Sequence, residues 1–343
     1  MRSFGSDNNS GVHPRIMHAL MESNVDHAIA YGDDKWTHEA EDVLRTMLED
    51  RELEPFFLFN GTGANVVALQ ACTLPFHSIL CAATAHIAVD ECGAPVKLTG
   101  ASLKEIVTPD GKLTPDLVRP HLQGFGFEHH SQPKVIAISQ TTELGTCYTA
   151  DEIKALADLA HAHDMYLFVD GTRIANACVH LGVTLKEITS DCGVDIFTLG
   201  GTKNGLMFGE ALVPLRKELA EHLKYYRKQT TQLYSKMRYI AAQFISYLNE
   251  NIWLENAQKS NAAARLLWNE MREIKGVEIT QSVESNALFF ILPKMITDKL
   301  RERYFFYDWD ESRNEMRLVC SWDTTELDIR NFIAYLKTLV AEA

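Results

Sequence analysis

Short apolar runs alternate with amphipathic stretches through the first two thirds of the chain. The clearest unit begins with the apolar residues 135–138, and Thr149 and Glu152 then form the pattern of a capping box that starts a helix. Apolar side chains recur at helical spacing after it, and further apolar runs follow at residues 165–169 and 195–199. This order of strand, helix, strand, connection and strand is typical of an α/β domain built on a parallel sheet.

The pattern changes after about residue 210. Residues 217–253 predict long helices, and residues 261–274 predict another amphipathic helix. Strand candidates follow at residues 277–280, 287–292 and 315–321, and residues 326–340 predict a closing helix. We therefore predict a large domain over residues 1–250, with an N-terminal segment that contributes to the site, and a small α+β domain over residues 251–343.

Composition narrows the class of protein. The chain has 343 residues, 46% of them hydrophobic, and a formal net charge of −13. An acidic surface repels phosphate backbones and anionic headgroups, so we expect neither nucleic acid nor a membrane as a partner. The N-terminus lacks the apolar core of a signal peptide, and no apolar run approaches the roughly 18 residues of a membrane span. The seven cysteines are scattered without a C-x-x-C pair, which predicts reduced thiols in the cytoplasm and no metal site.

Candidate chemistry gathers where the predicted strands end. Asp170, Arg173 and Lys203 lie at or just after such ends, and ligands of open α/β sheets bind at this edge. A carboxylate that can hold a protonated ring nitrogen and a lysine that can attack an aldehyde are the protein groups that pyridoxal phosphate (PLP) chemistry requires. The plainer alternatives are a solvated loop lysine and an aspartate that only caps a helix.

A glycine-rich turn offers a seat for a phosphate. An apolar run at residues 56–59 leads into Gly61, Thr62 and Gly63, and a helical pattern follows. The free N–H groups of a helix N-terminus bind phosphate. The turn lacks the third glycine of a dinucleotide fingerprint and the Gly-Lys-Ser/Thr of a P-loop, which argues against a dinucleotide dehydrogenase.

Several segments resemble the low-specificity L-threonine aldolases, which are PLP enzymes of fold type I in the aspartate aminotransferase superfamily. The matching segments occur in the family's order from residue 6 to about residue 319 and are Ser6-Asp7, Tyr31-Gly32-Asp33-Asp34, Asn60-Gly61-Thr62-Gly63-Ala64-Asn65, Ala85-His86-Ile87, Val169-Asp170-Gly171-Thr172-Arg173, Gly201-Thr202-Lys203-Asn204-Gly205 and Arg317-Leu318-Val319. The resemblance implies an α/β fold with a mostly parallel seven-stranded sheet flanked by helices, and a smaller C-terminal α+β domain.

The same resemblance implies roles around the cofactor. Lys203 would hold PLP covalently, Asp170 would pair with the pyridine nitrogen, and Arg173 would lie beside the ring. His86 would stack on the ring face. The phosphate would be bound by residues of the glycine-rich turn and, from a neighbouring subunit, by a basic segment, namely Gly61, Thr62, Gly63, Lys236 and Arg238.

Roles toward the substrate follow from the resemblance in the same way. Ser6 and Arg317, with Arg173 and Tyr31 nearby, would hold the substrate carboxylate. His129 falls where the family has a histidine near the substrate hydroxyl, so either His129 or His86 would remove the hydroxyl proton. The family also implies a homotetramer, a dimer of dimers with shared sites.

Departures from the family pattern bear on substrate choice. Residues 139–143 replace the usual Glu-Asn-Thr-His, and residues 232–236 replace a glycine-rich run. Asp90 or Glu91 stands where an aromatic residue is common. Without the resemblance, His86, Arg317, Arg238 and Lys236 would be read as ordinary structural or solvated side chains.

The implied reaction is retro-aldol cleavage of L-threonine, L-allo-threonine or a phenylserine-type amino acid to glycine and an aldehyde. Two other functions stay open at this point. One is a different PLP reaction on the same scaffold, either β-elimination or racemisation. The other is a non-catalytic protein of this fold that has lost turnover through the changes at residues 139–143.

Overall fold

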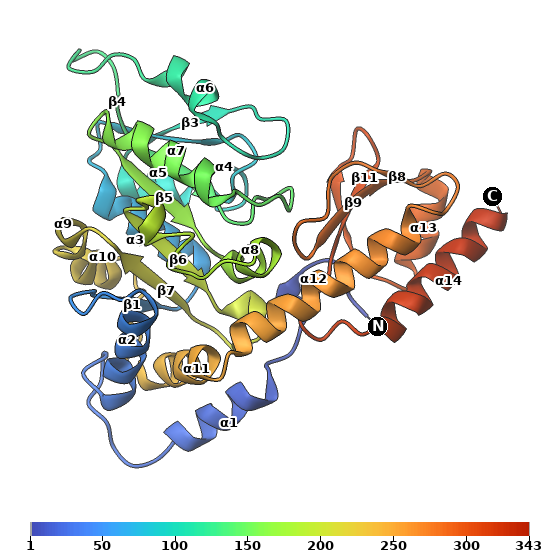
Figure 1. The fold of residues 1–343 in the computed structure, drawn as a ribbon, viewed down its shortest axis with the longest axis horizontal. Coiled ribbons are helices and arrows are strands. Elements are labelled where there is room, and N and C mark those ends of the chain that lie inside the picture. The colour runs from blue at the N-terminus through green and yellow to red at the C-terminus, as the bar shows by residue number, and fades with distance from the viewer. Residues whose placement is uncertain (1, 343) are drawn as a thin grey trace.

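The structure, a computed structural model, describes residues 2–342 and is organised around two β-sheets (Figure 1). The larger sheet has seven strands in the order β1-β7-β6-β5-β4-β2-β3. Strand β7 runs antiparallel to β1 and β6, and the other neighbours are parallel. The strands are β1 (Phe56–Leu58), β2 (His77–Ala82), β3 (Ser102–Ile106), β4 (Gln132–Ser139), β5 (Tyr166–Asp170), β6 (Ile196–Gly200) and β7 (Glu210–Pro214). The predicted mostly parallel seven-stranded sheet is therefore confirmed.

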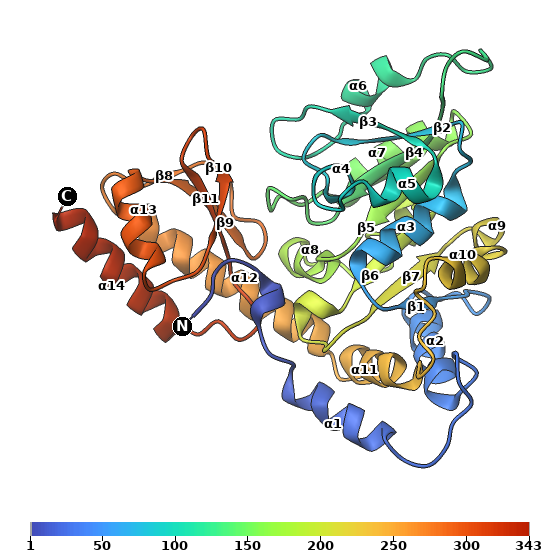
Figure 2. The ribbon, with the colours of Figure 1, turned by 180° about the vertical axis from the view of Figure 1, so that it is seen from behind.

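Helices cover both faces of this sheet. Helix α3 lies on the face turned to the viewer in Figure 2, and α7 lies on the face seen in Figure 1. The helices of this part are α1 (Pro14–Ser23), α2 (Lys35–Met47), α3 (Gly61–Cys72), α4 (His86–Val89), α5 (Ala94–Thr99), α6 (Pro115–Val118), α7 (Ala150–His161), α8 (Ile174–Leu181), α9 (Lys217–Ala220), α10 (Leu223–Gln229) and α11 (Arg238–Asn249), with short 3-10 helices η1 (Asp7–Asn9), η2 (Arg119–His121), η3 (Ser190–Cys192) and η4 (Thr202–Asn204). The capping box predicted at Thr149 begins α7.

The second sheet is antiparallel and has the strand order β10-β11-β9-β8. Its elements are α12 (Ile252–Met271), β8 (Glu278–Ile279), β9 (Ala287–Ile291), α13 (Lys294–Arg301), β10 (Tyr307–Asp310), β11 (Glu315–Val319) and α14 (Glu326–Glu342). Helix α12 runs from the larger part into the smaller one (Figure 1). The predicted boundary near residue 250 falls between α11 and α12 and stays a prediction.

Each sheet has its own apolar core. The larger core holds the buried strand residues of the seven-stranded sheet and the apolar faces of α3, α7 and α11. The smaller core holds α12, α14 and the inner face of the second sheet, together with Phe4 from the N-terminal segment. Phe4 accepts a hydrogen bond from Val319 N–H at 2.7 Å and donates one to the Phe305 carbonyl at 2.8 Å. The N-terminal segment therefore runs beside β11 and then leads into the larger part.

The sequence prediction was wrong in some details. Residues 217–253 do not form long helices, because the chain leaves the helical conformation after α10 and makes non-helical turns before α11. The helix expected at residues 261–274 begins earlier, at Ile252. Strand β10 was not predicted, because it is short and its first residues are exposed, so it lacks an apolar pattern. None of the helices in the described residues has the length and apolarity that crossing a membrane needs.

Candidate active site

The carboxyl ends of the central strands meet at one edge of the larger sheet. Asp170 ends β5, Gly200 ends β6 directly before the turn that carries Lys203, and β1 ends at Leu58 before the N-terminus of α3. These segments enclose a cavity of about 230 Å³, lined by Asn8, Asn60, Gly61, Thr62, Asn65, His86, Thr172, Thr202, Lys203 and Glu210. The structure thus brings Lys203 and His86 together with the predicted phosphate turn.

Lys203 lies on η4, and its amine forms no hydrogen bond or ion pair with the described residues. Burial lowers the pKa of this amine, and the positive charge of Arg173 lowers it further, against the opposing attraction of Asp7 and Asp170. A lowered pKa increases the neutral fraction of the amine near neutral pH. The neutral amine is the form that attacks a carbonyl group, so the surroundings of Lys203 suit the predicted covalent role.

Asp170 is buried, and its two carboxylate oxygens have different partners. Oδ2 accepts a hydrogen bond from Asn65 Nδ2 at 2.8 Å. Oδ1 accepts hydrogen bonds from the Thr172 backbone N–H at 3.0 Å and from the Thr172 hydroxyl at 2.7 Å. These three hydrogen bonds fix the orientation of the carboxylate. The carboxylate is therefore held in one position at the strand end, as an aspartate that pairs with a ring nitrogen must be.

Arg173 forms an ion pair with Asp7 from the N-terminal segment. Its Nε and Nη2 donate to the two oxygens of Asp7 at 2.7 and 2.9 Å, and Asn286 Nδ2 donates to the same carboxylate at 3.0 Å. Burial alone would raise the pKa of Asp7, but Arg173 outweighs it and holds that pKa below its ordinary value. This pair joins the N-terminal segment to the larger sheet, and a direct contact of Arg173 with substrate stays a prediction.

His86 begins α4, and buried acids fix both its backbone and its ring. Its Nδ1 lies 2.9 Å from Glu91 Oε1, which also accepts a hydrogen bond from Asn65 Nδ2 at 2.8 Å. Its backbone N–H donates to Glu143 Oε1 at 2.8 Å. The hydrogen bond from His86 Nδ1 to the Glu91 carboxylate raises the pKa of His86, although burial opposes it. Because Asn65 also bonds Asp170, one hydrogen-bonded chain links the predicted stacking histidine to the predicted ring-nitrogen partner.

The predicted phosphate turn is the first turn of α3. Asn60 caps this helix, and its Oδ1 accepts the Gly63 backbone N–H at 2.8 Å. The N–H groups of Gly61 and Thr62 remain directed to the end of the helix, where an anion binds well. Gly63 serves packing, because a Cβ there would meet Gln232 at 2.2 Å. Gln232 belongs to a segment that departs from the family pattern, and its Oε1 also accepts the Phe59 N–H at 3.1 Å.

Arg317 lies on β11 with a half-buried guanidinium. Its Nε is buried and has no hydrogen-bond acceptor among the described residues, and the group lies over the Trp309 ring at 5.4 Å. Burial lowers the pKa of Arg317, and neighbouring Arg173 lowers it further. A half-buried guanidinium without a carboxylate partner is suited to an anionic ligand. Phe4 pairs with Val319 at the end of β11, and the Ser6 hydroxyl accepts the Asn8 N–H at 3.1 Å, so a contact of Ser6 with substrate stays a prediction.

His129 lies apart from this group within one chain. It precedes Gln132, the first residue of β4, whereas the site lies near Ser139 at the other end of that strand. Seven residue steps along a strand span roughly 23 Å. The His129 side chain is also largely exposed, with a relative accessibility of 72%. Within one chain the structure therefore does not bring His129 to Lys203, and a role of His129 near the substrate hydroxyl stays a prediction.

Arg238, Lys236 and Tyr31 also lie away from Lys203. The Arg238 guanidinium donates to the Val25 carbonyl at 2.7 Å, and Arg238 and Lys236 line a separate hollow beside residues 27–30. Tyr31 is 52% exposed. Within one chain these residues form a second surface group and contribute nothing to the cavity around Lys203.

Four residues of this site were missed or given no role by the sequence analysis. Asn65, Glu91, Glu143 and Glu210 are all buried or nearly so and contact the predicted residues. Asn65 and Glu143 lay in segments compared with the family, and Glu91 follows His86 by little more than one helical turn, so signals existed for these three. Glu210 had no such signal, because it reaches the site through the pairing of β7 with β6 and β1, which a single sequence does not display.

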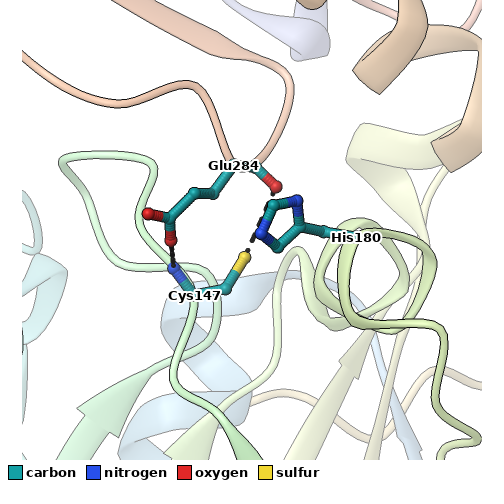
Figure 3. A group of neighbouring side chains, drawn as sticks. All are labelled: Cys147, His180 and Glu284. Carbon is teal, nitrogen blue, oxygen red and sulfur yellow. Dashed lines mark hydrogen bonds between the residues drawn. The ribbon is translucent and has the colours of Figure 1, made fainter.

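A separate cluster of Cys147, His180 and Glu284 lies where the two parts of the chain meet (Figure 3). Glu284 Oε2 accepts the Cys147 N–H at 2.8 Å, and the thiol donates to the Glu284 carbonyl at 3.5 Å. Burial raises the pKa of the thiol well above its ordinary value. The thiol proton and the carboxylate are thus already engaged, and we assign these contacts to holding the two parts together.

Comparisons with known proteins find similar sequences over nearly the whole chain. The sequence profile of a family described as beta-eliminating lyase matches residues 3–293. A low-specificity L-threonine aldolase from a Pseudomonas species is 38% identical over 342 residues, covering 99% of this chain and 98% of the relative. Another from Pseudomonas aeruginosa is 40% identical over 324 residues, covering 94% and 93%.

Two solved enzyme structures superpose on nearly the whole chain. A Leishmania major threonine aldolase superposes with a TM-score of 0.93 at 30% identity, covering 99% of this chain and 100% of that one. An aspartate aminotransferase from Thermus thermophilus superposes with a TM-score of 0.72 at 14% identity, covering 98% and 90%, and shares the fold.

Proposed function

The chain belongs to the beta-eliminating lyase family, and on that premise we propose that it is a PLP-dependent carbon–carbon lyase of the threonine aldolase type. It cleaves β-hydroxy-α-amino acids to glycine and an aldehyde. The observation that carries the proposal is the unpaired, half-buried Lys203 in a cavity that also holds the N-terminus of α3. L-Threonine, L-allo-threonine and phenylserine-type amino acids are the candidate substrates.

The residues present fit PLP. The unpaired amine of Lys203 suits its aldehyde, and Asp170 lies fixed at the neighbouring strand end for its ring nitrogen. The first turn of α3 has room for a phosphate, because even an added Cβ at Gly61 would meet only Thr172, at 3.8 Å. When bound, PLP supplies an electron sink for the charge that remains on the amino acid after the Cα–Cβ bond breaks.

The chain's own residues then orient the substrate and move its proton. The Arg317 guanidinium binds the substrate carboxylate, which fixes the amino acid relative to Lys203. The dyad of His86 and Glu91 acts on the β-hydroxyl: the Glu91 carboxylate holds Nδ1–H, so Nε2 is left to accept the hydroxyl proton. Proton removal from the hydroxyl accompanies formation of the aldehyde carbonyl, and the proton resides on His86 until it is returned to glycine or to water.

Product analysis tests this proposal against β-elimination, the rival that the family description favours. Incubation of the PLP-loaded protein with L-threonine should yield acetaldehyde and glycine in equal amounts. β-Elimination would instead give ammonia and a 2-oxo acid, and racemisation would change only stereochemistry. Release of ammonia without glycine would overturn the aldolase proposal.

Replacing Arg317 with alanine is expected to raise KM for L-threonine about 100-fold, because a charge-assisted paired contact to the carboxylate is lost. Arg317→Lys is the matched control. It keeps the charge but not the planar pair of donors, and we expect an increase in KM of about tenfold. Steady-state kinetics with saturating PLP measures both, and a KM within twofold of wild type in Arg317→Ala would remove this residue from the substrate site.

Replacing Glu91 with glutamine is expected to shift the acidic limb of the kcat/KM profile to lower pH. The Glu91 carboxylate raises the pKa of His86, and a base works only while it is neutral, so loss of that charge extends activity downward. We also expect a drop of about tenfold on the plateau, because the base becomes weaker and less well oriented. A profile with an unmoved acidic limb would argue that His86 is not the titrating base.

We further propose that the protein is a homotetramer built from dimers with shared sites. Arg238, Lys236 and Tyr31 lie outside the cavity of their own chain, beside exposed apolar residues of α1 and the following loop, including Met21 at 71% and Ile29 at 67% exposure. A second copy packed on this surface would cover the apolar side chains. In such a dimer the Arg238 guanidinium would bind the phosphate in the site of the other subunit, which gives its positive charge a function.

Co-expression of Lys203→Ala chains with Arg238→Ala chains tests the sharing. If Arg238 acts on the neighbouring site, mixed dimers have one intact site, and activity returns to about one quarter of wild type at limiting PLP. If Arg238 serves only its own chain, where it holds the Val25 carbonyl, both sites of a mixed dimer stay defective and no activity returns. Light scattering after size-exclusion chromatography gives the subunit number.

A reducing compartment such as the cytoplasm is the location that we propose. All seven cysteines are free, and all but Cys92 are buried. Unpaired thiols in this number are typical of proteins that are kept under reducing conditions.

A further inference from the structure

Glu210 occupies a central place in the site that the aldolase reaction does not use. It is the first residue of β7, and its Cα is paired with Gly200 of β6 on one side and with Leu58 of β1 on the other. Gly200 leads into the turn of Lys203, and Leu58 leads into the first turn of α3. Glu210 therefore lies between the lysine and the seat of the phosphate, and it lines the same cavity as both.

The Glu210 carboxylate is nearly inaccessible to solvent and has no cationic partner at ion-pair distance among residues 2–342. Only 3% of the residue is exposed. Its Oε2 accepts the Gly201 backbone N–H at 3.0 Å. The titratable groups that face it are Lys203 on η4, Asp170 at the end of β5 and Tyr247 on α11. An acid without a close counter-ion is thus enclosed where a phosphate is expected to bind.

A phosphate monoester carries a charge of about −1.5 to −2 at neutral pH. Two anions that share a dry site cannot both stay fully charged, and the more weakly held group takes up a proton. A protonated carboxyl has a further advantage here, because it can donate a hydrogen bond to a phosphate oxygen while its other oxygen still accepts from Gly201 N–H.

We propose that Glu210 takes up one proton when PLP binds and then donates a hydrogen bond to the cofactor phosphate. This inference rests on the proposed PLP function. It makes Glu210 a residue of the phosphate site and makes cofactor affinity depend on pH. The wild-type protein should hold the cofactor more weakly as the solution becomes alkaline.

The direction of this pH dependence follows from the state of the free protein. Burial raises the pKa of Glu210 to about 7, against the opposing effects of Thr202, Gly201 and Lys203. Below that pH the free site is already protonated, so affinity does not change with further acidification through this group. Above that pH, Glu210 must take up a proton from the solution each time the cofactor binds. The affinity for the cofactor therefore falls by about tenfold per pH unit.

Calorimetry with pyridoxine 5′-phosphate tests the proposal without catalysis, because this probe has the ring and the phosphate but no aldehyde for Lys203. Titrations at about pH 8 in buffers of different ionisation enthalpy give the number of protons taken up. Glu210→Gln is the informative variant, because glutamine resembles the protonated acid and can still accept from Gly201 and donate to phosphate. Glu143→Gln, which removes a buried acid on the His86 side of the site, is the matched control.

We expect wild type and Glu143→Gln to take up about one proton more per site than Glu210→Gln. Glu210→Gln should also bind the probe about tenfold more tightly than wild type at pH 8, with little pH dependence of its own. Equal proton uptake in Glu210→Gln and wild type would overturn the inference and leave the proposed function standing. If no protein binds the probe or PLP, the proposed function fails and this inference fails with it.

Infrared difference spectra keep the inference testable if Glu210→Gln does not fold. Binding of the probe to wild type at about pH 8 should convert a carboxylate band into the carbonyl band of a protonated carboxyl group, and this change should persist in Glu143→Gln. Binding without a new carboxyl band would overturn the inference.

Discussion

Replacing Lys203 with alanine should reduce aldehyde formation from L-threonine by at least about 10⁴-fold and remove the visible absorbance band of the bound cofactor. The amine is the group that attaches PLP covalently, and its place in the cavity, its missing partners and its lowered pKa all suit that role. No other lysine lines this cavity, so a neighbouring amine cannot take over.

Lys217→Ala is the matched control, because the Lys217 side chain is 85% exposed on α9 and far from the chemistry. It should retain both the absorbance band and wild-type kinetics. Aldehyde assays and absorbance spectra on the two variants, with circular dichroism to verify folding, complete the comparison. Substantial aldehyde release by Lys203→Ala would contradict the assignment.

Replacing Asp170 with asparagine should lower kcat by about 10³-fold with little loss of folded protein. The side chain keeps its size, and the amide oxygen can still accept from Thr172 or Asn65. What disappears is the negative charge that keeps the ring nitrogen protonated, and with it most of the electron-withdrawing power of the cofactor.

Steady-state rates with L-threonine, measured at saturating PLP, give the size of this effect. Asn65→Ala provides a graded comparison, because it removes one hydrogen bond to the Asp170 carboxylate and one to the Glu91 carboxylate but leaves both charges in place. We expect kcat of Asn65→Ala to be about tenfold lower than that of wild type. A kcat in Asp170→Asn close to that of wild type would show that this acid has a structural role only.

Much of the fold was predictable because it depends on local patterns. Apolar runs gave the strands β4, β5 and β6, and the sequence from Thr149 to Glu152 gave the start of α7. The rule that ligands bind at the carboxyl ends of strands then placed Lys203 and Asp170 at one edge. The family resemblance supplied the mostly parallel seven-stranded sheet with flanking helices, and the strand pairing and the superposed threonine aldolase structure confirm this fold.

The features that could not be predicted depend on contacts between distant segments. Glu210 enters the site because β7 pairs antiparallel with both β6 and β1, and strand order is not written in the local pattern. The local sequence shows Asn65 only as a polar residue of α3. Its role appears in the fold, where its amide donates hydrogen bonds to Glu91 and Asp170. His129 was placed by alignment of a motif, and its distance along β4 from the site shows only in three dimensions.

Chemical trapping of the lysine–cofactor bond tests the central claim most directly. The PLP-loaded protein is reduced with borohydride, which converts the bond into a stable amine, and the modified peptide is identified by mass spectrometry. We expect a single modified residue, Lys203, and no modified lysine when the Lys203→Ala chain is incubated with PLP and reduced in the same way. A modified lysine elsewhere, or a protein that carries no trapped cofactor after incubation with PLP, would contradict it.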